Sequence, residues 1–454
     1  MENATLLTQG TPWKKMLLFA FPILLGMLFQ ELYTTVDTWM VGVFISQEAL
    51  SAVGTVSVLA ALCRSCAIGF SSGAGIVTGV RFGEKNYAAL RTVAWNTFAL
   101  LAGIGIAVSA GAFVFSRELL ENLVAVPESL LPVADGYFKI LTLGFVFQFF
   151  YNGVAALLRS IGDSRSFLYF LVFSSLINTF LDYVCIVGLG KGVEGAAWAT
   201  VFSQFFCAVV SYWYMYRKYE CFRFAVGAER VSRAEMVEIL KQGIPLTVQS
   251  MLGTTYNLLM QRLVNSFGVA MTASYTVVSR VEGYLEMPVT TMTTTLATYT
   301  AQNRGARQPQ RIRQGVAQGI AVSVMTTFLL SVLCFGFPEQ IAAFFGITGQ
   351  SAVYCVTHIR YYAFTILSFA AYFPLMGYYQ GMGRSYLSGI SSAAYLVLSL
   401  GIGYIGKLYW AELALFVSKP VTWFVIGLLN CLYFFAGRKT YNNILKRGVI
   451  HEIM

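Results

Sequence analysis

Charged residues are scarce in this chain of 454 residues, since Asp, Glu, Lys and Arg together make up 11% of it. Soluble domains carry about 25%. Hydrophobic residues make up 57%, so the composition predicts a membrane protein. Histidine occurs only as His358 and His451, which is too few for a histidine-based metal or acid–base centre.

The sequence also lacks the motifs of enzymes and ATP-driven pumps. Cys63 and Cys66 form a C-x-x-C pair inside an apolar run, and no second pair stands at zinc spacing. No G-x-S-x-G, Gly-rich phosphate loop or nucleotide-binding motif is present. We therefore predict neither enzymatic activity nor a cofactor.

Twelve apolar stretches are each long enough to cross a bilayer, which takes about 20 residues. The predicted spans are 16–44, 50–78, 92–115, 138–159, 166–188, 194–216, 243–267, 271–300, 315–336, 359–381, 385–406 and 411–436. Prolines inside five of them are expected to bend the helices: Pro22, Pro245, Pro288, Pro374 and Pro420. Glycines at four-residue spacing in the second span, such as Gly69 and Gly73, predict close helix packing.

The second half of the chain repeats the first at offsets of 221 to 223 residues. Matching positions are Pro22 and Pro245, Tyr33 and Tyr256, Gly83 and Gly305, and Gly162 and Gly383. We predict an all-α polytopic membrane protein with twelve transmembrane helices in two parallel six-helix repeats. The expected domains are a lobe at 1–216, a cytoplasmic linker at 217–242 and a lobe at 243–454. Repeated halves are the usual architecture of secondary transporters, whose substrate site lies between them.

The basic residues predict the orientation in the membrane. In a twelve-span arrangement, 22 of the 31 Lys and Arg residues fall on one side, which places both termini in the cytoplasm. The net charge of +10 then reflects topology, and we expect no nucleic-acid partner. In the linker, the spacing of Ser232 and Glu235 predicts a capped short cytoplasmic helix.

Ionisable groups inside predicted spans are costly to insert and therefore indicate function. The first half has polar stripes with two acids: Asp37 with Gln30 and Tyr33, Asp182 with Asn178, Thr200 with Gln204, and Gln148 with Asn152. Such groups on facing helices predict a site for a proton or for Na⁺. The alternative is that Asp37 and Asp182 only hydrogen-bond across helices as structural pairs.

The second half has its own embedded charges. Arg280, Glu282 and Glu286 lie in the eighth span, and Lys419 lies in the twelfth. One interpretation is that Glu282 and Glu286 help to bind cationic substrates. The other is an internal salt bridge with Arg280 or Lys419, or a position near the outer membrane surface.

Six segments of the chain match a known pattern when they are taken in order: VDTWMVG in the first span, GFSSGAGIVTGVRFGEKNYAALR at the end of the second, LLRSIGDSRS, NTFLDYVCIVGLGKGVEGAAWATVFSQ, SRVEGYLEMPV and GYYQGMGRS. Through them the chain resembles the multidrug and toxic compound extrusion (MATE) family over essentially its whole length. It implies two six-helix lobes around a central cavity, and cation-coupled export by alternating access.

The resemblance also implies site residues. The cation site carries over to Asp37, Tyr33, Asn178, Asp182, Thr200 and, less closely, Asn152, with Na⁺ held at Asp37, Asn178, Asp182 and Thr200 if Na⁺ is the coupling ion. A substrate cavity is expected at Gln30, Gln148, Gln204, Tyr256, Glu282 and Glu286.

Acids that some relatives carry in the seventh and tenth spans are absent, which favours the branch with its site in the N-terminal lobe. We expect a monomer in a cell membrane, of the prokaryotic inner-membrane type, that exports small amphipathic or cationic molecules. A flippase of lipid-linked sugars from the same superfamily is the alternative.

Overall fold

The computed structural model describes residues 7–124, 126–223 and 231–446, without the side chains of 33, 37–39, 42, 47, 48, 50 and 437–446. Twelve long helices occur in these ranges: α1 (Pro12–Phe44), α2 (Gln47–Gly83), α3 (Tyr87–Val114), α5 (Leu131–Ser160), α6 (Arg165–Asp182), α7 (Gly192–Lys218), α8 (Arg233–Asn265), α9 (Val269–Gly305), α10 (Pro309–Gly336), α12 (Gly349–Gly381), α13 (Tyr386–Trp410) and α14 (Leu413–Lys446). The short elements are α4 (Ser116–Glu118), the π-helices η1 (Leu119–Val124) and η2 (Tyr183–Gly188), the 3₁₀ turn η3 (Glu220–Phe222) and α11 (Pro338–Phe344).

Each predicted span coincides with one long helix, and the fifth coincides with α6 and η2 together. Within the described residues, nine helices are long and apolar enough to cross a membrane on their own: α1, α2, α3, α5, α6 with η2, α7, α10, α13 and α14. The other three, α8, α9 and α12, lack a stretch of membrane-spanning length that combines high mean hydropathy with few charged residues. Polar groups on membrane helices turn toward protein or water-filled space, so these three helices are the ones expected to rely most on protein neighbours.

The chain folds into two compact units that do not follow its two halves. Unit 1 is Met1–Thr255, Thr294–Gly315 and Gly377–Ile390, and unit 2 is Tyr256–Thr293, Val316–Met376 and Ser391–Met454. Unit 1 thus joins the first half to the ends of several second-half helices. The division into lobes at 1–216 and 243–454 stays a prediction.

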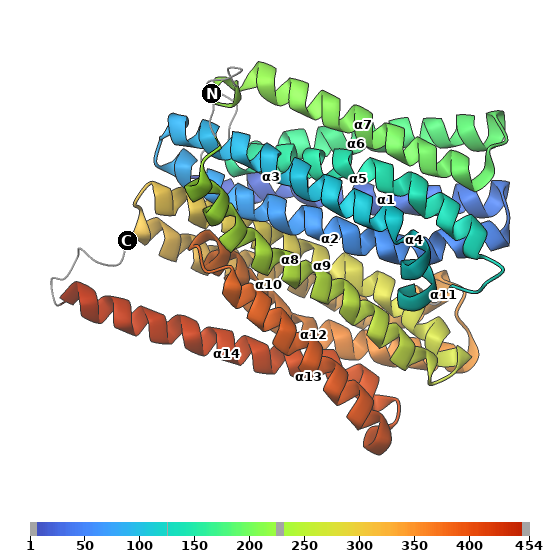
Figure 1. Cartoon of the computed structure of the whole chain (residues 1–454). Helices are drawn as coiled ribbons and strands as arrows, with labels where there is room; N and C mark the ends of the chain where they lie inside the picture. Colours follow the sequence, from blue (N-terminus) through green and yellow to red (C-terminus); the bar gives the residue numbers. More distant parts are fainter. Residues whose placement is uncertain (1–6, 125, 224–230, 447–454) are drawn as a thin grey trace. The chain divides into compact units, whose positions relative to one another are not determined.

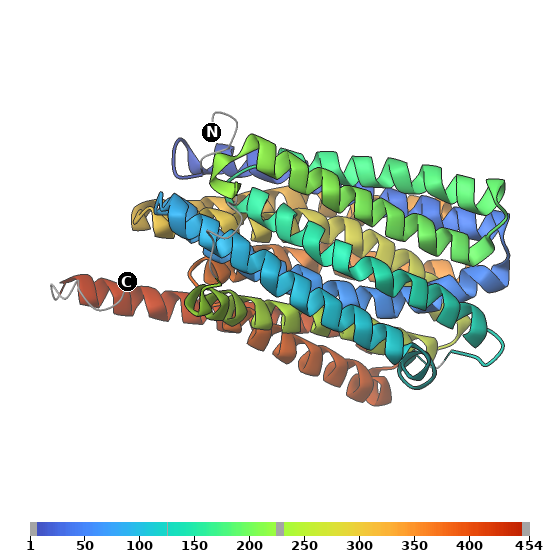
Figure 2. The same cartoon turned by 45° about the horizontal axis from the view of Figure 1, so that its top comes forward.

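Helix α5 is central in unit 1, where it packs against α2, α3 and α7 (Figures 1 and 2). Helix α6 lies between α1 and α7. Buried apolar side chains such as Phe138, Phe145 and Ala197 fill the space between α5 and its neighbours. Burial of such side chains contributes about 1.5–3 kcal/mol each for the larger ones.

Glycines bring helices of unit 1 into close backbone approach, as the four-residue spacing predicts. A Cβ built on Gly69 would lie 2.3 Å from the α-carbon of Thr247, and one on Gly73 would lie 2.4 Å from the nitrogen of Gly243. Gly83 and Gly305, which occupy matching positions in the two halves, also lie close to the backbone of another helix. A Cβ on Gly83 would lie 2.0 Å from the carbonyl oxygen of Gln302, and one on Gly305 would lie 2.1 Å from that of Val80. Any larger side chain at these positions would force the helices apart.

The predicted short linker helix is wrong in its extent. Ser232 does accept a hydrogen bond from the backbone N–H of Glu235, at 3.4 Å, so the cap is confirmed. The helix then continues through Pro245 as α8 to Asn265. A proline removes one backbone hydrogen bond, and helices packed against others tolerate this loss.

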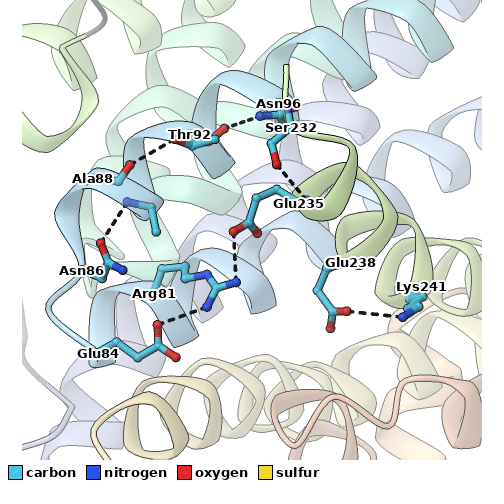
Figure 3. A network of polar contacts seen from close by, with 11 residues as sticks. Arg81, Glu84, Asn86, Ala88, Thr92, Asn96, Ser232, Glu235, Glu238 and Lys241 are labelled. Atoms are coloured by element: carbon cyan, nitrogen blue, oxygen red, sulfur yellow. Dashed lines mark hydrogen bonds and ion pairs between the residues drawn. The ribbon is translucent and has the colours of Figure 1, made fainter. Parts of the chain in front are cut away.

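The start of α8 is attached to α2 and α3 by polar contacts (Figure 3). Arg81 lies between Glu84, at 3.2 Å, and Glu235, at 3.0 Å. The backbone N–H of Ser232 donates to Oδ1 of Asn96 at 2.9 Å. An arginine that binds two carboxylates in this way holds two helices in register.

Unit 2 has a core of aromatic and methionine side chains. Buried members from α8, α9 and α14 include Tyr256, Met260, Tyr275 and Phe416. The rings of Tyr256 and Tyr395 lie 4.9 Å apart, which brings α8 and α13 together. This core surrounds the charged groups of the second half.

Candidate cation-coupling site

Asn178 and Asp182 stand one turn apart on α6, and both side chains are buried, with 1% and 0% of their surface exposed. The amide nitrogen of Asn178 donates to the hydroxyl of Ser203 on α7, in a long hydrogen bond of 3.5 Å. Buried polar groups inside a bilayer have to find partners within the protein. The facing sides of α6 and α7 therefore form a polar stripe inside an apolar helix bundle.

The backbone widens directly after Asp182. Helix α6 ends at this residue and the chain continues as the π-helix η2, Tyr183–Gly188. Short π-helical turns in proteins are frequent at functional sites, because they shift the side chains of one turn relative to the next. The hydropathy pattern predicts an uninterrupted span here and does not indicate this change of winding.

Thr200 and Ser203 supply hydroxyl oxygens on α7. The hydroxyl of Thr200 donates to the carbonyl of Ala196 at 3.0 Å, and that of Ser203 donates to the carbonyl of Thr200 at 2.8 Å. A hydroxyl oxygen has two acceptor lone pairs, and that of Ser203 uses one of them to accept from Asn178. A carboxylate, an amide and two hydroxyls are oxygen ligands of the kind that hard cations prefer.

The described residues leave the α1 part of the predicted site open. The side chains of Tyr33 and Asp37 lie outside the described residues. Helix α1 itself packs against α6, so its backbone passes beside the helix of Asp182. That Asp37 faces Asp182 stays a prediction.

The other first-half residues predicted for the cation site or the substrate cavity lie on three different helices, α1, α5 and α7. Asn152 on α5 donates to the carbonyl of Gln148 in its own helix, at 2.8 Å. Gln204 is half-buried, and its Oε1 lies 2.5 Å from where a Cβ on Gly144 of α5 would be. Gln30 is exposed on α1. The structure thus brings Asn178 and the Ser203 hydroxyl together and places Asp182 one turn further along α6. Contacts of Asp182 with the α7 hydroxyls, and the role of the three glutamines as substrate contacts, stay predictions.

The second-half residues meet in unit 2. Lys419 on α14 pairs with Glu282 on α9, and Tyr362 on α12 donates to Glu286 at 2.7 Å. Of the two basic partners considered for Glu282, the structure places Lys419 beside it. The hydroxyl of Ser399 lies 3.1 Å from that of Tyr256.

A buried acid between α5 and α6 is not among the predicted site residues. Asp163 is 3% exposed and receives hydrogen bonds from Tyr219 at 2.7 Å, from Tyr214 at 3.1 Å and from Lys218 at 3.2 Å. Burial raises the pKa of this carboxyl, but the bonds from Tyr219 and Ser166 and the charge of Lys218 outweigh burial and hold its pKa below the usual value. The sequence does contain a signal for this group: an acidic residue in the connection LLRSIGDSRS, on the side of the membrane where most basic residues fall.

Apolar helices in two repeated halves, with a buried carboxylate–amide pair in the first half, define a multi-pass membrane transporter rather than an enzyme. The chain belongs to the MatE family, whose sequence model matches residues 22–184 and 245–405, one stretch in each half. The matches begin at Pro22 and Pro245, the residues that open the repeat.

Relatives with assigned names agree with this membership. The chain is 29% identical to "Probable multidrug resistance protein YoeA" of Bacillus subtilis (strain 168), over 76% of each chain. It is 29% identical to "Probable multidrug resistance protein YpnP" of the same organism, over 66% of each chain. Its fold matches the structure titled "Outward-facing conformation of a multidrug resistance MATE family transporter of the MOP superfamily" with a TM-score of 0.89, at 21% identity, over 98% of this chain and 99% of that one.

Proposed function

We propose that this MatE-family transporter exports small amphipathic or cationic molecules in exchange for H⁺ or Na⁺. The observation that carries the proposal is the buried polar stripe of Asn178, Asp182 and Ser203 between α6 and α7. Two relatives named as probable multidrug resistance proteins support the class of substrate. A carboxylate at the core of an apolar bundle is costly to insert, and such groups mark ion and proton pathways.

The coupling ion binds at Asp182, with Asn178 and the α7 hydroxyls as further oxygen ligands and with Asp37 from α1. Occupation removes the negative charge that otherwise repels the second carboxylate, so α1, α6 and α7 pack more closely when the ion is bound. An ion and a drug are exchanged only if each favours a different conformation. Ion binding therefore weakens drug binding, and the reverse.

The site in the first half is the driving site in this proposal. The acids of the second half are already engaged, Glu282 by Lys419 and Glu286 by Tyr362. On α8 the polar residue Gln261 donates to Asn265 of its own helix at 2.8 Å. These contacts support the branch of the family that relies on its N-terminal lobe.

The protein works as a monomer in the cell membrane, with both termini in the cytoplasm. The support for this orientation is the bias of basic residues to one side. The polar attachment of Arg81 to Glu84 and Glu235 then lies on the cytoplasmic side (Figure 3).

The test is export of a fluorescent cationic dye by proteoliposomes, with a pH gradient and a Na⁺ gradient imposed separately. The parental protein should transport dye with one gradient, and Asp182→Asn should not. Asp135→Asn is the matched control, because Asp135 is an acid of the same half that pairs with Lys139 at 2.8 Å at the start of α5. Gradient-driven dye export at the parental rate by Asp182→Asn would contradict the proposed coupling site.

A further inference from the structure

A second buried charged group lies wholly within unit 2 and is called the Lys419 cluster here: Glu282, Glu286, Lys419 and Tyr362. Three helices contribute to it, α9, α12 and α14. Only 5% of the Glu282 side chain and 11% of the Lys419 side chain are exposed. The charges of this cluster are therefore balanced mainly by one another.

The balance is incomplete. The cluster contains two carboxyl groups and one ammonium group, so with both acids ionised it carries one net negative charge. Lys419 engages Oε2 of Glu282, and the hydroxyl of Tyr362 engages Oε1 of Glu286. The remaining oxygen of Glu282, Oε1, is buried and has no hydrogen-bond partner among the described residues. A buried carboxylate oxygen without a donor is strongly disfavoured in the charged state.

The surroundings of the cluster are mainly aromatic. Nζ of Lys419 lies 5.8 Å from the ring centre of Tyr256 and 5.7 Å from that of Tyr362. The further titratable groups around it are Tyr275 on α9, His358 and Tyr372 on α12, and Tyr395 on α13. Arg280 is exposed on α9. Two tyrosine faces stabilise the ammonium group, and its contact with Glu282 makes Lys419 the resident cation of this carboxylate.

We infer that the Lys419 cluster binds one exchangeable proton, shared between Glu282 and Glu286. The proton converts one carboxylate into a carboxylic acid and brings the net charge of the cluster from −1 to zero. When it resides on Glu282, the buried Oε1 no longer belongs to a charged group that lacks a donor. Because Lys419 already occupies the cation position, a proton is the species that fits the remaining charge. The proton enters through Glu286, because this residue is half-buried whereas Glu282 is buried.

The inference is tested by infrared difference spectroscopy of the purified full-length protein between acidic and alkaline pH. Besides the signals of its other carboxyl groups, the parental protein should show a distinct protonated-carboxyl band of the Lys419 cluster that disappears as the pH rises. Glu282→Gln and Glu286→Gln should each lose this band, because each leaves one carboxylate balanced by Lys419 and needs no proton. Glu412→Gln is the matched control, since Glu412 also accepts a hydrogen bond from a tyrosine, Tyr354, at 3.0 Å. Its spectrum should keep the band.

A milder variant guards against loss of folding. Tyr362→Phe keeps both acids and the lysine but removes the donor to Glu286, so it should move the midpoint of the band upward by about 1 to 2 pH units. An unshifted band in Tyr362→Phe, or a band retained by both glutamine variants, would overturn the inference. A band that Na⁺ removes at constant pH and ionic strength would overturn the assignment to a proton. Asp182→Asn should leave the band unchanged, so the result is independent of the proposed coupling site.

Discussion

The two halves of this transporter bury their acids in opposite ways. In the first half, Asp182 is buried one turn along α6 from Asn178, whose amide donates to a hydroxyl of α7. In the second half, Glu282 is paired with an ammonium group on another helix. A carboxylate among neutral oxygens can take up and release a cation, whereas a carboxylate beside a fixed lysine has its cation built in. In this account the first half exchanges the coupling ion, whereas in the second half Lys419 neutralises one of the two acids and a single proton is left to balance the other.

The largest expected effect comes from removing the lysine that neutralises the second-half acids, and it is an effect on stability. Lys419→Met leaves Glu282 and Glu286 without their cation, which should lower the free energy of unfolding in detergent by about 3–5 kcal/mol at neutral pH. The loss should shrink at acidic pH, where both acids are neutral. Thermal unfolding measures it.

The matched comparison is Lys139→Met, which removes the partner of Asp135 in a pair that is 39% and 21% exposed. Its cost should stay below about 1 kcal/mol. A Lys419→Met protein as stable as the parent at neutral pH would mean that the second-half lysine does not neutralise the acids.

The next effect concerns coupling in the first half. Dye affinity of the purified protein should fall by about 5- to 150-fold as H⁺ or Na⁺ saturates the site, measured by fluorescence titration. The dependence should vanish in Asp182→Asn and in Asp37→Asn, because neutral side chains bind no ion. It should persist in Glu282→Gln, and its loss there instead would place the driving site in the second half.

Asp163, a buried acid that lies between two predicted spans, can be compared with the acids inside the spans. Asp163 is fully hydrogen-bonded, so Asp163→Asn should cost about 2 kcal/mol of stability at pH 7. Its pKa in the folded protein lies below the usual value, so the carboxylate contributes stability above about pH 4, and this contribution is lost as the pH falls through the folded pKa. Parent and variant should therefore converge in acid, as followed by unfolding at a series of pH values. A difference that grows in acid would contradict the assigned charge state.

The smallest perturbation tests topology alone. Single cysteines at Lys191, which is exposed next to Gly190, and at Lys85, in a variant without the native cysteines, should leave transport unchanged. A membrane-impermeant thiol reagent added to intact cells should label the first and not the second. Labelling at Lys85 from outside would reverse the predicted orientation.

Much of the fold is predictable because the bilayer requires long apolar helices with internally satisfied backbones. The twelve predicted spans coincide with the twelve long helices of the described residues, although α8 begins at Arg233 instead of 243. Helix ends were underestimated because polar residues continue helices beyond the apolar core, as in α9 and α14. The close approach at Gly69 and Gly73 was predictable from small-residue spacing.

The candidate site was predictable in its residue types and less so in its partners. Asn178 and Asp182 share a face of α6 by helical spacing alone, and both are buried. Their contact with Ser203 depends on how α6 packs on α7. The π-helical turn after Asp182 has no hydrophobic-periodicity signal, because its residues are almost all apolar. Asp163 finds Tyr214, Lys218 and Tyr219 more than 50 residues away in sequence, so no local pattern indicates them.

Local hydropathy and recurrence along the chain were enough to establish the number and placement of the helices, the duplication and the resemblance to a transporter family. The pairing of Lys419 with Glu282, and the approach of Gly83 and Gly305 to the backbone of a distant helix, are visible only in the folded protein. Hydropathy is a property of each segment, whereas an ion pair between α9 and α14 depends on the rotation of each helix about its axis. That rotation is set by the packing of all neighbouring side chains at once.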